Sequence, residues 1–189
     1  IDGEVDQTMA EEVAFNSKVH RPGVCNAAET LLIEKTIANM ILPSLCKKLS
    51  DAGVELRGDK MTKNILTDSG IEIGTANDSD WDEEYLDLIL SIKIVNGIKE
   101  AIEHINIHGS GHTETIITKN PESAKRFQTE VDSSTIFWNA STRFTDGGQF
   151  GMGAEIGIST DKIGARGPMG LEELTTYKWL GTADGLIRE

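Results

Sequence analysis

Cysteine, aromatic residues and positive charge are all scarce in this 189-residue sequence. Its two cysteines make neither a disulfide framework nor a CxxC pair for structural zinc, which favours a reducing, cytoplasmic setting. Only 18 lysines and arginines stand against 31 aspartates and glutamates, and the net charge of −13 argues against partners such as nucleic acid or an anionic membrane. No apolar run approaches the ~18 residues that span a bilayer, and no basic and then apolar leader opens the chain.

The apolar content is nevertheless sufficient for a core. Hydrophobic residues make up 38% of the sequence, which excludes a wholly disordered or low-complexity chain. The chain begins at Ile1 without an initiator methionine, so we expect a fragment or a processed product.

Short apolar runs alternate with amphipathic segments up to residue 139, and this alternation predicts an α/β fold with a parallel sheet covered on both faces. Pro43 is expected to kink its helix or to begin a new first turn, and residues 58–84 are expected to be irregular. The predicted helices are 6–18, 37–49, 98–105 and one that starts at Asn120-Pro121-Glu122; the predicted strands are 30–33, 54–57, 88–95, 115–118 and 135–139.

The character of the chain changes after Asn139. Residues 146–170 are rich in glycine and show little periodicity. Thr175 to Leu180 predicts a lone strand without a partner in the sequence. Because an unpaired strand exposes its backbone hydrogen-bonding groups, we expect it to pair with another chain.

Cys25 is the residue most suggestive of chemistry. It follows a break at residues 20–24 and precedes a stretch that could begin a helical turn, and Arg21 is close in sequence. A positive helix end and a cation would favour its thiolate form. The alternative is a small buried hydrophobe, as we expect for Cys46 within its amphipathic helix.

No metal site is expected. His104, His108 and His112 are spaced four apart, but Gly109 interrupts the helix that would align them. The acidic stretch 78–84 lacks the glycine and the final acid of a calcium loop.

Arg143 follows a predicted parallel strand, together with Ser141 and Thr142. Ligands gather beyond the carboxyl ends of such strands, and arginine with hydroxyl groups can hold a carboxylate or a phosphate. The alternative is an ordinary surface arginine.

Four stretches carry longer motifs, and together they extend over nearly the whole chain. They resemble the gamma-glutamyl phosphate reductase (glutamate-5-semialdehyde dehydrogenase) family of the aldehyde dehydrogenase superfamily, in its C-terminal half only. The stretches are residues 21–32 (RPGVCNAAETLL), 131–134 (VDSS), 139–151 (NASTRFTDGGQFG) and 165–171 (ARGPMGL).

The resemblance implies a three-layer catalytic α/β domain of the aldehyde dehydrogenase type at residues 1–145. It implies a glycine-rich connection and oligomerisation tail at 146–189, with the N-terminal cofactor-binding half absent from this chain. Cys25 matches the nucleophile. Glu84 matches the acid that binds the nicotinamide ribose hydroxyls, although the Phe-Gly-Pro that commonly follows that acid is replaced by residues 86–88 (LDL).

The chemistry implied is NADPH-dependent reduction of L-glutamyl 5-phosphate to L-glutamate 5-semialdehyde and phosphate, in proline biosynthesis from glutamate. Cys25 would carry the acyl group as a thioester. Ser141, Thr142 and Arg143 are our candidates for binding the substrate's α-carboxylate or phosphate. The implied cofactor is NADP(H). The implied partners are the glutamate 5-kinase that makes the substrate and further copies of the chain in a homo-oligomer.

Two other interpretations remain open at this point. Cys25 with His20 could serve a thiol-dependent acyl transferase or hydrolase. The chain as given could also act only as an oligomerisation and half-site module, without activity as an isolated fragment.

Overall fold

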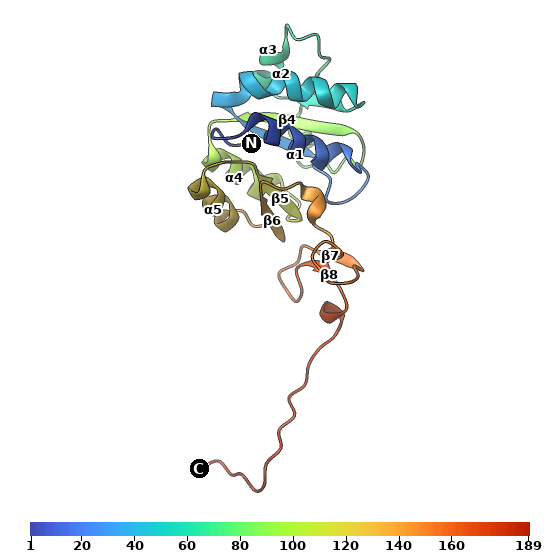
Figure 1. Ribbon diagram of the computed structural model, residues 1–189, viewed down its shortest axis with the longest axis vertical. Helices are drawn as coiled ribbons and strands as arrows, with labels where there is room; N and C mark the ends of the chain where they lie inside the picture. Colours follow the sequence, from blue (N-terminus) through green and yellow to red (C-terminus); the bar gives the residue numbers. More distant parts are fainter.

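The computed structural model describes residues 1–189, which form an α/β body with a long C-terminal extension (Figure 1). The central sheet has four parallel strands in the order β1-β4-β2-β3. The parallel sheet expected from the alternating pattern is therefore confirmed. Its strands are β1 (Thr30–Glu34), β2 (Glu55–Gly58), β3 (Gly74–Thr75) and β4 (Ile89–Val95).

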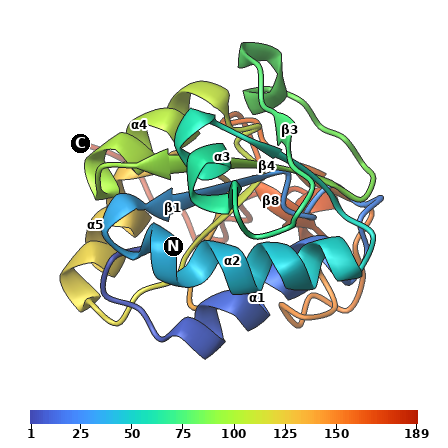
Figure 2. The ribbon, with the colours of Figure 1, turned by 90° about the horizontal axis from the view of Figure 1, so that it is seen from above.

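Helices lie on both sides of this sheet, with α1 and α2 on one side and α4 on the other (Figure 2). The main core forms where α1 and α2 meet alternate residues of β4, namely Leu90, Ile92 and Ile94. A smaller core lies between α4 and α5. The helices are α1 (Gln7–Val19), α2 (Lys35–Asp51), α3 (Lys60–Leu66), α4 (Ile98–His108) and α5 (Pro121–Glu130).

The helix α2 runs without interruption through Pro43, so the new first turn predicted there does not occur. Proline removes one backbone hydrogen bond from a helix and disfavours the turn before it. Here the loss is offset by an apolar face on which Ile41, Leu45 and Leu49 are fully buried.

Part of the stretch expected to be irregular is ordered. Residues 58–84 contain α3, the short strand β3 and a 3-10 turn, η1 (Asp78–Trp81). The Asp59 carboxylate caps α3 by accepting the Thr62 N–H at 2.7 Å. Only Thr62 and Leu66 of this helix are buried. Its sequence therefore lacks the apolar stripe from which a helix can be predicted.

The N-terminal residues join the main sheet to a second one, formed by parallel strands β5 (Thr113–Ile116) and β6 (Thr135–Trp138). Ile1 accepts the Glu34 N–H at 3.0 Å next to β1, and the Asp2 N–H donates to Ile117 at 3.1 Å beyond β5. The strand predicted at 115–118 thus begins two residues earlier, at Thr113.

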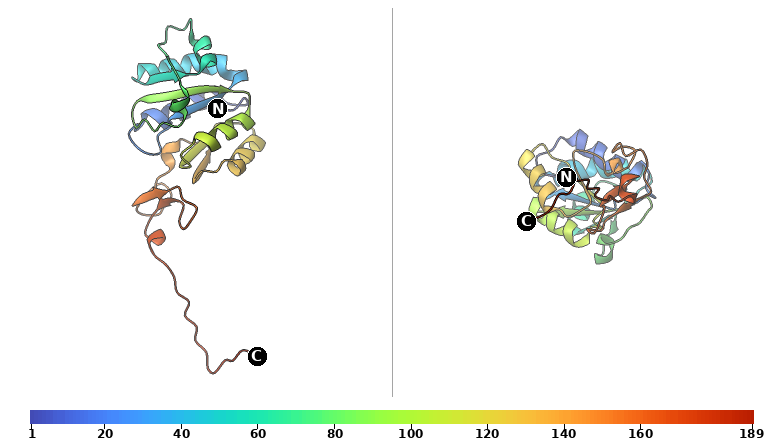
Figure 3. Two further views of the ribbon diagram at one scale, coloured as in Figure 1. Left: turned by 180° about the vertical axis from the view of Figure 1, so that it is seen from behind. Right: turned by 90° about the horizontal axis from the view of Figure 1, so that it is seen from below.

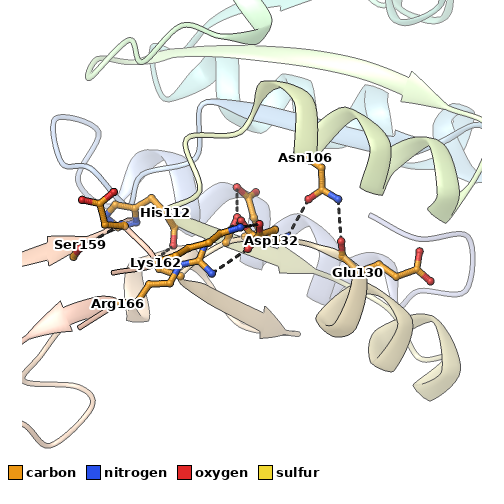
Figure 4. A network of polar contacts seen from close by, with 11 residues as sticks. Asn106, His112, Glu130, Asp132, Ser159, Lys162 and Arg166 are labelled. Carbon is orange, nitrogen blue, oxygen red and sulfur yellow. Dashed lines mark hydrogen bonds and ion pairs between the residues drawn. The ribbon is translucent and has the colours of Figure 1, made fainter. Parts of the chain in front are cut away.

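An antiparallel pair that the sequence analysis did not predict, β7 (Gly157–Ser159) and β8 (Gly167–Met169), follows the body. Asp132 attaches it by ion pairs to Lys162 and Arg166, the latter at 3.0 Å (Figure 4). Lys162 and Arg166 lie 30 and 34 residues from Asp132 in the sequence, so only folding brings the three side chains together.

The tail leads away from the body (Figures 1 and 3). Residues 175–189 form no helix or strand, so the strand predicted at Thr175–Leu180 is not formed within this chain. Tyr177 and Trp179 are 81% and 90% exposed. Pairing of this segment with another chain stays a prediction. None of the helices combines the length and hydrophobicity that crossing a bilayer requires.

Candidate active site

Cys25 lies in a turn between α1 and β1. The Ala27 N–H donates to the Val24 carbonyl at 2.9 Å, which closes the turn around the cysteine. The Ala28 N–H donates to the Ser17 carbonyl at 2.9 Å, which fastens the turn to the end of α1. No helix begins after Cys25, so that part of the prediction is wrong. The side chain is exposed and thus accessible to a ligand.

The electrostatic environment of Cys25 also differs from the prediction. Partial desolvation raises the pKa of its thiol, and the carboxylates of Glu155 and Glu84 raise it further. The Arg143 guanidinium opposes them by lowering the pKa, but it does not prevail. Desolvation by burial is the largest cause of this shift, so the environment of Cys25 favours the thiol rather than the expected thiolate, and no helix begins there to oppose it.

The loop after β6 brings the predicted substrate-binding residues next to the Cys25 turn. Ser141 Oγ lies 3.2 Å from Ser17 Oγ and accepts the Arg143 N–H at 3.3 Å, so its hydroxyl already serves the loop. Thr142 Oγ1 and Arg143 Nε are buried without a hydrogen-bond partner. Of the three residues, Thr142 lines the cavity around Cys25, whereas Ser141 and Arg143 do not.

Sequence reasoning missed His112 as a neighbour of this site. His112 Nδ1 lies 2.7 Å from Thr113 Oγ1, and that hydroxyl donates to Thr145 Oγ1 at 2.8 Å. The other ring nitrogen, Nε2, is buried and has no hydrogen-bond partner. Burial lowers the pKa of His112, which keeps the ring neutral, while Glu84 and Glu155 oppose this.

Asn26 was also missed. Its side-chain N–H donates to the Thr145 carbonyl at 2.8 Å and joins the Cys25 turn to the loop after β6. No pattern in the sequence around Asn26 predicts this contact, because Thr145 lies 119 residues further along the chain.

Glu84 lies in the loop between η1 and β4. It is exposed, and its carboxylate makes no hydrogen bond within the chain. The residue that follows is anchored instead, since Tyr85 Oη lies 2.7 Å from Asp80 Oδ1 and 2.8 Å from Ser91 Oγ. Glu84 acts on the pKa of both Cys25 and His112, so the three groups are close in space.

A cavity of about 210 Å³ connects these groups. Cys25, Glu84, His112 and Thr142 all line it, together with residues of β1 and β5. The arrangement places a thiol, a free carboxylate and an unpartnered hydroxyl around one space, which suits covalent chemistry on a bound ligand.

His104 and His108 lie side by side on α4, with ring centroids 4.5 Å apart, and each ring also contacts a charged side chain. His108 Nδ1 lies 2.8 Å from Asp82 Oδ1, and His104 Nδ1 lies 3.2 Å from Lys93 Nζ. No group of three or more His, Cys, Asp or Glu side chains is arranged to hold a metal ion.

Known proteins resemble this chain over its entire length. It is 54% identical to the gamma-glutamyl phosphate reductase of Thermoanaerobacter pseudethanolicus over 189 residues, which is 98% of this chain and 45% of that protein. It is 53% identical to the enzyme of the same name from Thermodesulfovibrio yellowstonii, covering 100% of this chain and 44% of the relative. The chain thus spans less than half the length of these curated relatives. No family model matches the sequence.

Solved structures agree with the sequence relatives. The crystal structure of gamma-glutamyl phosphate reductase from Thermotoga maritima superposes with a TM-score of 0.95 at 49% identity, over 100% of this chain and 44% of that one. An acetylating aldehyde dehydrogenase from Geobacillus thermoglucosidasius superposes with a TM-score of 0.59 at 17% identity, over 78% of this chain and 40% of that one. The second likeness shows the aldehyde dehydrogenase type of α/β fold and no more.

Proposed function

The chain is homologous over its whole length to one part of the gamma-glutamyl phosphate reductases, and from this premise we propose that it supplies the nucleophile of such an enzyme. The reaction is reduction of L-glutamyl 5-phosphate by NADPH to L-glutamate 5-semialdehyde and phosphate, a step of proline biosynthesis. Residues 1–145 act as the catalytic domain and residues 146–189 as the assembly region. The shared cavity that Cys25 and Glu84 both line supports this assignment best.

Cys25 performs the covalent step. Its sulfur attacks the acyl carbon of the substrate, the bond to the phosphate oxygen breaks, and a thioester to Cys25 remains. The raised pKa of the thiol means that Cys25 still carries its proton, which has to leave as the sulfur attacks and can be taken up by the departing phosphate. The backbone N–H of Cys25 is our candidate donor to the oxyanion that develops on the substrate carbonyl.

Arg143 and Thr142 hold the substrate in this proposal. Arg143 lies close enough to Cys25 to lower the pKa of the thiol, and its Nε has no partner within the chain. A guanidinium can bind a carboxylate or a phosphate through two parallel hydrogen bonds. It would also offset the acidic net charge of −13 when an anionic substrate approaches.

Glu84 is the residue that fits a nicotinamide cofactor. Its carboxylate is exposed, without a hydrogen bond in the chain and close to Cys25, as an acceptor for ribose hydroxyls requires. When bound, NADP(H) supplies the hydride that reduces the acyl group. Since the chain spans less than half of its relatives, we expect the isolated chain to show no turnover.

Assembly and supply of substrate complete the proposal. The exposed Tyr177 and Trp179 of the tail are suited to burial against another copy of the chain in a homo-oligomer. The substrate is an acyl phosphate, which a glutamate 5-kinase would supply, and both enzymes would work in the cytoplasm.

The test is Cys25→Ala in the enzyme that contains this chain, with Cys46→Ala as the matched control. Oxidation of NADPH, followed by absorbance, is expected to be lost in Cys25→Ala and retained in Cys46→Ala. Acyl-phosphate turnover without any NADPH oxidation in the unsubstituted enzyme would instead favour the acyl transferase that pairs Cys25 with His20.

A further inference from the structure

We propose that the buried ion pair of Lys18 and Glu29 is a positioning device that sets Glu84 relative to Cys25. The effect on cofactor binding by Glu84 rests on the proposed function, whereas the effect on the position of the Glu84 loop does not. The pair joins three segments that are distant in sequence: the end of α1, the turn of Cys25 and the loop of Glu84.

Glu29 uses its two carboxylate oxygens for two different segments. Oε2 accepts Lys18 Nζ at 2.6 Å, and Oε1 accepts the Leu86 N–H at 3.2 Å. Glu29 lies four residues after Cys25, and Leu86 lies two residues after Glu84. A single side chain therefore connects the nucleophile segment to the segment of the predicted cofactor acid.

The burial of the pair makes this connection rigid. The Lys18 side chain has no exposed surface, and that of Glu29 is 18% exposed. Burial acts to lower the pKa of Lys18 and to raise that of Glu29, and the contact between them opposes both shifts. Because each charge lacks another strong partner, Lys18 holds Glu29 in one orientation, with Oε1 toward Leu86.

The backbone of Leu86 requires such support. Its φ is 52°, and it is one of two non-glycine residues in the chain with a positive φ. A leucine in this region is strained, and surrounding contacts must hold it there. A Cβ at Gly23 would lie 3.4 Å from the Leu86 carbonyl oxygen, so the Cys25 segment packs against the same turn.

The two sides of the Glu84 loop are therefore held differently. Tyr85 is fixed to Asp80 and to Ser91 of β4, and Leu86 is fixed to Glu29 beside Cys25. Without the bond between Leu86 and Glu29, the loop would stay attached to the sheet through Tyr85. Its position relative to Cys25 would no longer be fixed. Glu84 would then bind a cofactor ribose less well, while the Cys25 turn would keep its bonds to Ser17 and Thr145.

The experiment compares three paired variants of the enzyme that contains this chain. Lys18→Met with Glu29→Leu removes both charges and the acceptor for Leu86. Lys18→Met with Glu29→Gln removes the charges but keeps an acceptor oxygen. Lys47→Met with Asp51→Leu is the control, because that pair is exposed, with side chains 69% and 65% accessible.

Hydrogen exchange at the Leu86 amide is the first readout. We expect it to accelerate about tenfold or more in the Leu variant, to accelerate by a smaller amount but more than threefold in the Gln variant, where an acceptor remains but Lys18 no longer orients it, and to be unchanged in the control. The rate of Cys25 alkylation by iodoacetamide is expected to remain within twofold in all three. Exchange of Leu86 within twofold in the Leu variant would overturn the proposal, as would equal acceleration of all amides in β1 and β4.

Kinetics of the enzyme that contains this chain provide the second readout. The Leu variant is expected to raise the KM for NADPH about tenfold and to change kcat at saturating NADPH less than twofold. Equal effects on both constants would assign the pair a general structural role. An unsubstituted enzyme without reductase activity would refute the proposed function, and the exchange experiment would still decide the positioning role.

Discussion

Removal of one member of the Lys18–Glu29 pair is expected to destabilise the fold far more than removal of both. Nζ and Oε2 are 2.6 Å apart, and Lys18 has no exposed side-chain surface. Breaking a buried pair on one side typically costs ~3–5 kcal/mol, whereas replacing both members by apolar side chains is often nearly neutral. Because domains of this kind are stable by about 5–15 kcal/mol, the single variants should remain folded but lose much of that margin.

The two single variants should not be equivalent. Glu29→Gln leaves a fully buried ammonium group, whereas Lys18→Met leaves a carboxylate that is 18% exposed and still accepts the Leu86 N–H. Glu29→Gln is therefore expected to be the more destabilising. Without the Glu29 carboxylate, the pKa of Lys18 in the folded chain falls further below its value in the unfolded chain. The unfolded chain therefore binds more protons than the folded chain does. The stability of Glu29→Gln should then rise with pH above 7, by at most about 1.4 kcal/mol per pH unit.

Urea unfolding followed by circular dichroism measures these effects as a double-mutant cycle. Because each single loss costs ~3–5 kcal/mol and the double loss is nearly neutral, we expect a coupling energy of roughly 6–10 kcal/mol for Lys18→Met with Glu29→Leu. For the exposed Lys47–Asp51 pair, the same cycle should give below about 0.5 kcal/mol. Additive single effects at Lys18 and Glu29, or a Glu29→Gln variant that loses stability as pH rises, would refute the reasoning.

Three further predictions concern the site and the tail. Iodoacetamide should label Cys25 well before Cys46, because Cys25 is exposed while Cys46 is buried and burial raises its pKa to about 12; peptide mapping that finds equal labelling would contradict this. Arg143→Lys should raise the KM for L-glutamyl 5-phosphate by an amount equivalent to ~1–3 kcal/mol and leave the KM for NADPH unchanged, because lysine keeps the charge but loses the guanidinium fork. Equal losses for both ligands would indicate a structural arginine. Deletion of residues 172–189 should lower the particle mass in light scattering below that of the undeleted protein, and an unchanged number of subunits would show that the tail is not the assembly element.

The fold was predictable where an element carries its own apolar pattern. The helix α2 was expected because its buried residues recur at the helical period, and the strand β4 because it is a nearly continuous apolar run that is buried on both faces. The helix α3 and the β7–β8 pair were not expected. A cap at Asp59 stabilises α3, and ion pairs to Asp132 hold the β7–β8 pair, and neither feature produces hydrophobic periodicity.

Of the five residues predicted for the site, Cys25, Glu84 and Thr142 line one cavity, and Ser141 and Arg143 do not. Cys25 and Glu84 were chosen from motifs, and the structure brings them to one cavity. The direction of the Cys25 pKa shift was not predictable, because it depends mainly on the partial burial of the thiol in the folded chain, to which the carboxylates of Glu155 and Glu84 add. The contact of Glu29 with Leu86 was equally inaccessible, since no pattern in the sequence joins those two positions.

The most direct test of the proposed function is capture of the acyl group on Cys25. The enzyme that contains this chain is mixed with L-glutamyl 5-phosphate without NADPH, quenched in acid and examined by peptide mass spectrometry. The account predicts one glutamyl group on the peptide that contains Cys25, and its disappearance when NADPH is added before the quench. A glutamyl group on another residue, or Cys25 left unmodified while phosphate is released at the full rate, would contradict it.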